Sequence, residues 1–371
     1  MKKEVKIIFH IDLNAFFAQC AIIKEPYLKD KIFAIGRGSG SKRGIISTAS
    51  YKARKLGIRS GISVKEALDI YPKLLIVPSD YSLYKKQSKI FFDFLGKYSS
   101  IILKGSIDEA YIDLTEMSKS RSPLDIAGEI QNTLNEKYQL PVSIGIAPTI
   151  FLAKMASDMK KPLGITVIRR KEIVKKIFPL SIKDLYGIGK KTYPKLEAFG
   201  IKTIGDFTKE DNKEKILNLM SIVNYEGLLN EILGYGEDTI NPHKYDIPKS
   251  ISTESTLSTT KDEVEIIVPI LNKQYEEVHK KMLQEKMKAR TFGIKLKYDD
   301  FTLVTRSKTL FEYTDNFDEG FLVIEDLFLN NHDGKPLRLV GVYIKELMLN
   351  SEIEKDINLF NYIDFIRKKE N

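Results

Sequence analysis

The sequence predicts a multidomain α+β protein. Its 371 residues are 43% hydrophobic and 29% charged, which is ordinary for globular proteins, and the length allows two or three domains of roughly 150 residues. Residues 15–170 and 250–348 alternate short β-branched runs with stretches of helical periodicity, whereas residues 171–240 show helical spacing throughout. Two α/β regions separated by a helical one are therefore expected.

The first region predicts one mixed sheet backed by helices. Residues 5–11 form a short apolar run typical of a buried strand, which Asp12 and Asn14 should break. Residues 15–80 mix strands and helices around a Gly/Ser-rich loop at 36–44. The elements expected next are a helix at 81–98, a β-hairpin at 100–114, a helix at 124–137, a strand at 141–147, a helix at 149–159 and a strand at 164–168.

The second half predicts a helical segment, a linker and a smaller α+β unit. Glycine turns at 187–189, 200 and 234–236 divide the helical segment, and residues 241–249 are polar with two prolines, as expected of a linker. The elements expected beyond it are strands at 251–258, 291–298, 302–309 and 337–347 and helices at 263–286 and 317–329.

Charge and composition narrow the function classes. The single cysteine, Cys20, excludes a disulfide scaffold, and four scattered histidines argue against a histidine-rich metal site. The net charge of +9 is uneven: residues 1–170 hold 28 Lys/Arg and 16 Asp/Glu, a balance of +12, while the remaining 31 and 34 give −3. A polyanionic partner for the first half is one reading and solvated lysines are the other. No apolar run reaches the ~20 residues of a membrane span, so a cytoplasmic protein is expected.

Two acidic segments are candidates for metal binding. Asp12 ends the first strand, and Asp108-Glu109 lies in the predicted hairpin among apolar residues. Carboxylates without nearby His or Cys favour Mg²⁺ or Mn²⁺. Two such ions about 3.5–4 Å apart can serve phosphoryl transfer. The alternative is a solvated Asp-Glu pair beside a turn.

Two further segments suit phosphate. In Ser47–Gly57, Tyr51 and Arg54 lie at i, i+3 on one helix face, although a capped surface helix would show the same pattern. Gly187-Ile188-Gly189, followed by Lys190, forms a turn between helical stretches whose N–H groups can approach a nucleic-acid phosphate. A plain helical turn is the alternative.

Together these segments resemble the Y-family DNA polymerases, of the bacterial DNA polymerase IV type. The resemblance extends from about residue 5 to 348, with five motifs in the family's order and spacing. These are Phe9–Ala18, Ser47–Gly57, Ser106–Tyr111, Gly145–Gly164 and Gly187–Gly189.

The resemblance implies roles for individual residues. Asp12, Asp108 and Glu109 would be catalytic and, with the carbonyl of Leu13, would hold two Mg²⁺ ions, for which Mn²⁺ can substitute. Phe17 would be the steric gate against ribonucleotides. The implied nucleotide contacts are Phe16, Phe17, Thr48, Tyr51, Arg54 and Lys161. The implied DNA contacts are Lys42, Arg43, Gly187, Gly189, Lys190, Lys295, Lys297, Arg306 and Lys308, the last four expected on one sheet face.

The implied architecture is a right hand and the implied function is template-directed, low-fidelity DNA synthesis past damaged bases. Primer–template DNA and deoxynucleoside triphosphates would be its partners, and the protein would act as a monomer without a proofreading domain. The implied domains are a palm (1–14 and 81–170), fingers (15–80), a thumb (171–240), a linker (241–249), a little finger (250–348) and a tail (349–371).

Several positions depart from the family pattern, and other functions stay open. Asn14, Ala15, the pair Cys20-Ala21 and the pair Thr149-Ile150 differ from the usual residues without removing a metal ligand. The tail segment Asp356–Phe360 resembles a peptide that binds the sliding clamp, with an amphipathic tail as the alternative. The competing functions are a two-metal nuclease or nucleotidyl cyclase, a damage-induced polymerase subunit that needs accessory factors, and a catalytically idle DNA-binding scaffold.

Overall fold

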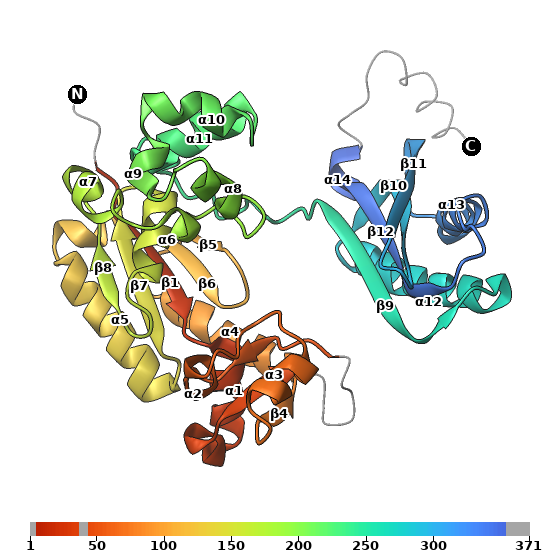
Figure 1. Ribbon diagram of the computed structural model, residues 1–371, viewed down its shortest axis with the longest axis horizontal. Helices are drawn as coiled ribbons and strands as arrows, with labels where there is room; N and C mark the ends of the chain where they lie inside the picture. Colours follow the sequence, from red (N-terminus) through yellow and green to blue (C-terminus); the bar gives the residue numbers. More distant parts are fainter. Residues whose placement is uncertain (1–4, 37–43, 354–371) are drawn as a thin grey trace. The chain divides into compact units, whose positions relative to one another are not determined.

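The computed structural model describes residues 5–36 and 44–353, and the chain divides into two compact units (Figure 1). The first comprises residues 1–243 and the second residues 244–371. The boundary falls inside the stretch 241–249, where the sequence predicts a linker. Within the described ranges, no helix has both the length and the apolar character needed to cross a membrane.

The first unit is built on a five-stranded mixed sheet in the order β5-β6-β1-β7-β8. The central strand β1 pairs antiparallel with β6 and β7, and β8 runs parallel to β7. The mixed sheet and the hairpin β5-β6 are as predicted. The strands are β1 (Ile8–Leu13), β5 (Ile102–Lys104), β6 (Glu109–Asp113), β7 (Val142–Ala147) and β8 (Ile165–Val167).

Strand β1 corrects one expectation. The prediction that Asp12 and Asn14 break the strand is wrong at Asp12, because β1 continues to Leu13. Two hydrogen-bonded neighbours hold it there, with Asp12 opposite Glu109 on β6 and Leu13 opposite Val142 on β7. Asp12 is therefore fixed inside a sheet, with less freedom than a loop residue would have.

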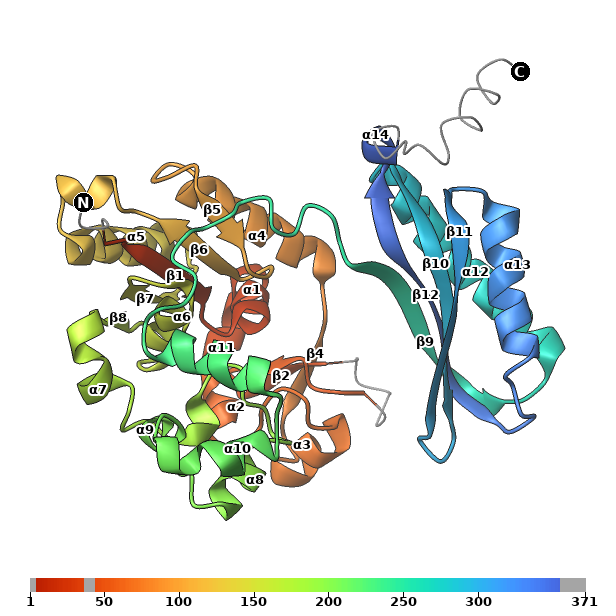
Figure 2. The same ribbon diagram turned by 90° about the horizontal axis from the view of Figure 1, so that it is seen from above.

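Helices cover both faces of this sheet (Figure 2). On one face Phe9 and Ile11 pack against α4 (Tyr81–Leu95) and α5 (Pro123–Tyr138). On the other face Ile8 packs with α6 (Ile150–Asp158), whose N-cap Thr149 accepts a hydrogen bond from Leu152 N–H. Because side chains alternate along a strand, His10 and Asp12 share the α6 face with Ile8.

Gly145 on β7 lets α6 approach the sheet closely. A Cβ at this position would lie 2.0 Å from the carbonyl oxygen of Ala153 and 2.4 Å from the nitrogen of Ser157. Any side chain would therefore push α6 away from the sheet. The close packing brings the α6 side chains beneath the end of β1.

Residues 15–80 contain a second, three-stranded sheet of the first unit, in the order β3-β2-β4. Helix α1 (Phe16–Lys24) begins directly after β1 and α2 (Tyr51–Lys55) directly after β3. Ser50 caps α2, accepting a hydrogen bond from Ala53 N–H. The remaining elements are β2 (Phe33–Gly36), β3 (Thr48–Ala49), β4 (Leu75–Pro78), α3 (Val64–Ile70) and the 3₁₀ helix η1 (Pro26–Asp30).

Residues 171–240 are helical, as predicted, in short pieces that share a core with α6. Ile173, Leu196 and Ile232 are buried in that core beside Leu152 of α6. The α-helices are α7 (Ile173–Lys176), α8 (Tyr193–Ala198), α9 (Ile204–Phe207), α10 (Lys213–Leu217) and α11 (Ile222–Ile232).

The second unit is a four-stranded antiparallel sheet in the order β11-β10-β12-β9, with α12 and α13 in the core on one face (Figure 2). Its elements occur where the sequence predicts them, and the strands are longer. They are β9 (Ser250–Lys261), α12 (Val264–Gln284), β10 (Met287–Tyr298), β11 (Leu303–Thr314), α13 (Phe317–Leu329), β12 (Leu337–Leu349) and the short α14 (Asn350–Ile353).

The register of β10 and β11 shows that four predicted DNA contacts do not share a face. Arg306 lies opposite Ile294 and Lys308 opposite Phe292, and both partners are buried on the helix side. Lys295 and Lys297 alternate with these apolar residues and face the other way. The prediction of a single face is wrong, because strand alternation alone does not give the register between strands.

Candidate active site

The strand pairing of β1 and β6 brings the predicted carboxylates together. Asp12 is directly opposite Glu109 in the antiparallel register. Asp108 precedes β6, and its carbonyl accepts a hydrogen bond of 3.0 Å from Leu13 N–H. Ser106 Oγ lies 2.5 Å from Asp108 Oδ1 and steadies that carboxylate. Asp12 and Asp108 are 96 residues apart in the sequence, and strand pairing places them together at one end of the sheet.

Burial and crowding perturb these acids. Burial, followed by the adjacent Glu109 carboxyl, raises the pKa of Asp12 to about 7. Burial also raises the pKa of Asp108. Burial alone would raise the pKa of Glu109 as well, but hydrogen bonds with His10, Asp12 and Lys154 outweigh it and hold that pKa below its ordinary value. The cluster therefore concentrates negative charge that positive partners must balance.

Two lysines supply positive charge. Lys161 Nζ lies 2.6 Å from Asp12 Oδ2 and 2.7 Å from Asp158 Oδ1. Lys154 Nζ lies 2.6 Å from Glu109 Oε1 and 3.4 Å from Asp12 Oδ2. Sequence reasoning predicted Lys161 and missed Lys154. A signal was present, because Lys154 is the one basic residue in the otherwise apolar stretch from 150 to 156.

His10 lies beneath the cluster and was also missed. It is fully buried, with Nδ1 2.7 Å from Ser157 Oγ and Nε2 3.8 Å from Glu109 Oε2. Burial lowers the pKa of His10. Ser157 Oγ also donates to the carbonyl of Lys154 at 2.9 Å, so His10 and Lys154 are linked through one hydroxyl.

A cavity of about 240 Å³ adjoins the acids and gathers the predicted nucleotide contacts. Arg54 is fixed at its wall by bonds from Nε to the Ala49 carbonyl and from Nη2 to Thr48 Oγ1, both 3.0 Å, and its guanidinium lies over the Tyr51 ring. The lining residues are Asp12, Leu13, Asn14, Ala15, Phe16, Phe17, Ser47, Thr48, Tyr51, Arg54, Ser60, Asp108 and Lys161.

Phe17 lies in this wall on a firm support. Its ring stacks on Tyr84 of α4 with centroids 4.2 Å apart and planes 16° apart. Phe16 is buried, whereas Phe17 is half-buried. Both residues line the cavity, and Phe17 is the more exposed of the two.

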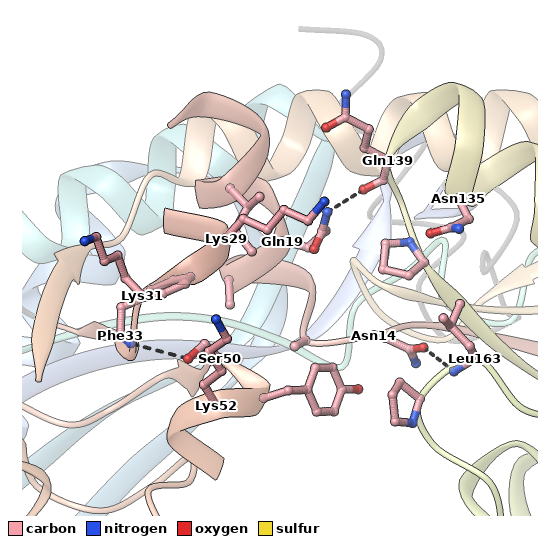
Figure 3. A pocket seen from close by; sticks show the side chains of 16 residues that line it. Asn14, Gln19, Lys29, Lys31, Phe33, Ser50, Lys52, Asn135, Gln139 and Leu163 are labelled. Carbon is pink, nitrogen blue, oxygen red and sulfur yellow. Dashed lines mark hydrogen bonds between the residues drawn. The ribbon is translucent and has the colours of Figure 1, made fainter. Parts of the chain in front are cut away.

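Asn14 is a hub between β1, β7 and the segment that carries Lys161. Its Oδ1 accepts a hydrogen bond of 2.9 Å from Leu163 N–H, and its Nδ2 donates to Ser143 Oγ at 3.0 Å. Figure 3 shows Asn14 beside Leu163, and both residues line a second cavity of about 560 Å³. Gln19, Lys29 and Lys52 line the same cavity. The sequence places Asn14 at the end of the first strand and among the departures from the family pattern, and predicts no role for it in the site.

The predicted DNA contacts of the first unit are only partly described. Gly187 adopts a left-handed backbone with φ of 94°, which glycine allows without strain. Gly187, Gly189 and Lys190 are all exposed, so the turn is free to meet a ligand. Lys42 and Arg43 lie outside the described residues, as does the tail segment Asp356–Phe360.

The donor set suits hard divalent cations. Asp12, Asp108 and Glu109 offer carboxylate oxygens at one end of the sheet, which are the ligands that Mg²⁺ and Mn²⁺ prefer. Among the described residues, no group of three or more His, Cys, Asp or Glu side chains is arranged as a complete metal-binding cluster. The ammonium groups of Lys154 and Lys161 lie against the carboxylates instead.

Family models match both units of the chain. The model described as impB/mucB/samB family matches residues 11–158, and that family's C-terminal domain matches residues 248–359. DNA polymerase IV of Oceanobacillus iheyensis is 36% identical over 365 residues, covering 98% of this chain and 86% of that protein. DNA polymerase IV 1 of Bacillus subtilis is 34% identical over 362 residues, covering 98% and 87%.

Solved structures agree with the sequence matches. A Y-family DNA polymerase chimera of Dbh and Dpo4 matches with a TM-score of 0.83 and 26% identity, covering 93% of this chain and all of that one. An insertion ternary complex of Dbh DNA polymerase matches with a TM-score of 0.66 and 26% identity over the same shares. The chain therefore belongs to the Y family of DNA polymerases. Within that family it belongs with the bacterial DNA polymerase IV proteins.

Proposed function

We propose that this protein is a template-directed DNA polymerase of low fidelity that extends primers past damaged bases by nucleotidyl transfer. The observation that carries the proposal is that three kinds of residue line one cavity. Asp12 and Asp108 line it together with Phe17, Arg54 and Lys161, which combines metal-binding oxygens, a flat ring and phosphate-binding cations.

We assign the acidic end of the sheet as the metal-binding centre. Asp12, Asp108, Glu109 and the carbonyl of Leu13 would hold two Mg²⁺ ions, for which Mn²⁺ can substitute. When bound, such ions lower the pKa of the primer 3′-hydroxyl and neutralise charge on the triphosphate. The strand pairing of β1 with β6 holds Asp12 and Glu109 at a fixed separation before substrate arrives.

The protein's own side chains would orient the nucleotide. Arg54 presents a planar fork of donors, held by Thr48 and the Ala49 carbonyl, and Lys161 adds a point charge for the triphosphate. Tyr51 can donate a hydrogen bond from its hydroxyl to the same triphosphate. Phe17, backed by Tyr84, would lie under the sugar and leave no space for a 2′-hydroxyl.

The domain assignment follows from the same reading. The five-stranded sheet with α4 to α6 would be the palm (1–14 and 81–170), residues 15–80 the fingers and 171–240 the thumb. Residues 241–249 would be the linker, 250–348 the little finger and 349–371 the tail. The boundary between the two compact units after His243 supports the linker position. A cytoplasmic location goes with this proposal, because template and nucleotides must reach the site.

Primer–template DNA would be bound by both units. The exposed turn at Gly187 and Gly189, with Lys190, would contact backbone phosphates. In the second unit the face opposite the helices carries Lys295 and Lys297. Hydroxyl side chains share that face with the two lysines, namely Ser250, Ser252, Thr256, Thr305 and Ser307. Arg306 and Lys308 point to the other side and are not proposed as contacts of this surface.

Primer extension with purified protein and Mg²⁺ tests the proposal, beside Asp108→Ala and a matched control, Asp113→Ala. Asp113 is the last residue of β6, the strand that Asp108 precedes, and it pairs with Lys6 and does not line the cavity. We expect Asp108→Ala to lose at least about 10³-fold in extension rate, because several kcal/mol of charge stabilisation disappear. Asp113→Ala should keep its activity while losing stability.

The same assay separates the other functions. Shortening of the primer would indicate a nuclease. DNA binding without extension in the wild-type protein would indicate a scaffold or a subunit that needs accessory factors. Either result would overturn the proposal for the isolated chain.

A further inference from the structure

Lys154 is the most enclosed cation in the acidic cluster. Its Nζ lies 2.6 Å from Glu109 Oε1, 3.4 Å from Asp12 Oδ2 and 3.5 Å from Asp158 Oδ2, and its side chain is 11% exposed. A buried ammonium persists only where opposite charges compensate for lost hydration. Burial alone would lower the pKa of Lys154, but Asp158, Glu109 and Asp12 outweigh it and hold that pKa above its ordinary value.

The two lysines of the cluster differ in what they can reach. Lys161 is 29% exposed and lines the 240 Å³ cavity, so a ligand in the cavity can draw it away from Asp12. Lys154 is absent from the cavity lining, although its Nζ shares Asp12 Oδ2 with Lys161, and its shortest contact is with Glu109. A triphosphate can therefore recruit Lys161, whereas Lys154 stays with the carboxylates.

The fold around Lys154 leaves its ammonium little freedom. The residue lies in α6 between the buried Ala153 and Met155, at the point where Gly145 allows the helix to touch the sheet. Its carbonyl accepts the hydroxyl of Ser157, which is held in turn by His10. Helix packing and these hydrogen bonds thus fix the backbone of Lys154, and the ion pair with Glu109 holds its Nζ.

We propose that Lys154 is a built-in counter-ion that limits the affinity of the carboxylates for divalent cations until a nucleotide arrives. The inference rests on the proposed function. Asp12, Asp108, Glu109 and the adjoining Asp158 carry up to four negative charges, which Lys154 and Lys161 reduce to two. An incoming triphosphate adds negative charge and engages Lys161, so the cations bind together with the nucleotide. Lys154 is a positioning residue in this scheme, because it acts through Glu109 and Asp12.

Mn²⁺ binding to the full-length protein without DNA tests the inference. Lys154→Gln removes the charge and keeps a hydrogen-bonding group for Glu109, and Lys154→Met removes both. Lys160→Met is the matched control, since it removes the same charge from an exposed position nearby. Free Mn²⁺ is followed by electron paramagnetic resonance, and melting temperatures are measured with and without the metal.

We expect each folded Lys154 variant to bind Mn²⁺ at least about tenfold more tightly than the wild type, since a charge about 3 Å from the ligands is removed. Their metal-free melting temperatures should fall and recover when Mn²⁺ is added. Lys154→Arg should restore the wild-type Mn²⁺ affinity, and Lys160→Met should leave it unchanged. Unchanged or weaker Mn²⁺ binding in a folded Lys154→Gln protein would overturn the inference.

A measurement on the wild type covers the case in which both charge-removing variants fail to fold. The ¹⁵N signal of the Lys154 ammonium should persist with Mg²⁺ alone and shift only when Mg²⁺ and a deoxynucleoside triphosphate are added together. A shift with Mg²⁺ alone would contradict the inference. Primer extension by the wild type is scored separately, so failure of the proposed function is distinguishable from failure of the role of Lys154.

Discussion

The two larger sheets of the molecule hold their charged residues in opposite ways. In the five-stranded sheet, Asp12 and Glu109 face each other across paired strands, and Lys154 bridges them in a largely buried cluster. In the four-stranded sheet, Lys295 and Lys297 stand on the face opposite the helices, only partly covered. The first arrangement depends on each member, because removing one leaves buried charges uncompensated. In the second, Lys295 is paired with Glu254 at 2.6 Å but both side chains remain partly exposed, so single changes should have small effects.

This difference predicts how large the effect of a substitution should be in each sheet. Single changes in the cluster or its cavity should alter catalysis or selectivity by orders of magnitude. Single changes on the exposed face should weaken DNA binding modestly, by an amount that depends on the salt concentration. The predictions below test that contrast from the largest effect to the smallest.

The largest of these effects is expected at Phe17. Phe17→Ala removes the ring that stacks on Tyr84 and opens space in the cavity wall. Discrimination against ribonucleotides should fall by about 10²-fold, while insertion of deoxynucleotides persists. Single-nucleotide insertion kinetics with matched ribo- and deoxynucleotides measure the ratio. Phe16→Ala is not a substitute control, because Phe16 is buried in the core, and Tyr81→Ala serves better as an exposed neighbour of Phe17. An unchanged ratio would remove Phe17 from the role of steric gate.

A smaller effect should separate the two faces of the second sheet. Replacing Lys295 and Lys297 together by alanine should weaken duplex binding about tenfold and reduce the salt dependence by one to two phosphate contacts, roughly 1 unit of log–log slope each. Arg306 and Lys308 replaced together remove the same charge from the other face. We expect that pair to bind nearly as the wild type does. Fluorescence anisotropy over a series of salt concentrations measures the affinity for duplex DNA. Equal losses of affinity in the two double variants would refute the assignment of faces.

The smallest effect concerns the helical part of the first unit. Asp206 and Thr203 form a capping box at α9, and Asp206 Oδ1 lies 2.8 Å from Lys209 Nζ. The hydrogen bond from Lys209 comes first among the causes that lower the pKa of Asp206 to about 2. Asp206→Ala should destabilise the protein by about 1 kcal/mol at neutral pH, with no change in nucleotide selectivity.

The pH dependence of that loss follows from the direction of the pKa shift. A lowered folded-state pKa contributes stability above the unfolded-state value of 3.8, and that stability disappears as the pH falls through about 2. Urea unfolding of Asp206→Ala and of the exposed control Asp211→Ala should therefore differ at pH 7 and converge near pH 2. A gap that persists at pH 2 would mean that Asp206 acts through packing instead.

Much of the fold was readable in the sequence because local periodicity decides it. Helix α13 (Phe317–Leu329) has the bounds that its apolar spacing predicts, and the hairpin β5-β6 forms around Gly105 as expected. The ends of strands were harder to predict. Leu13, for example, belongs to β1 because it pairs with Val142, which is distant in the sequence. Hydrogen bonding to a distant strand overrides the local preference of Asp12 for a loop.

The site residues also differ in whether local sequence or distant contacts determine their roles. Asp12 and Arg54 were candidates from residue type and spacing alone, whereas Phe17 and Lys161 became candidates only through the resemblance to Y-family polymerases. Lys154 could not be assigned from the sequence, since its role depends on the close approach of α6 to β7 at Gly145. The faces of Lys295 and Arg306 also required the register between strands, which alternation within one strand does not give.

The central claim is that the chain copies a template. The most direct test supplies Mg²⁺, a primed template and one deoxynucleotide at a time, opposite each of the four template bases. The account predicts that the primer grows by the complementary nucleotide far faster than by the others, with occasional errors and without shortening of the primer. Extension that ignores the template base, or shortening of the primer, would contradict it.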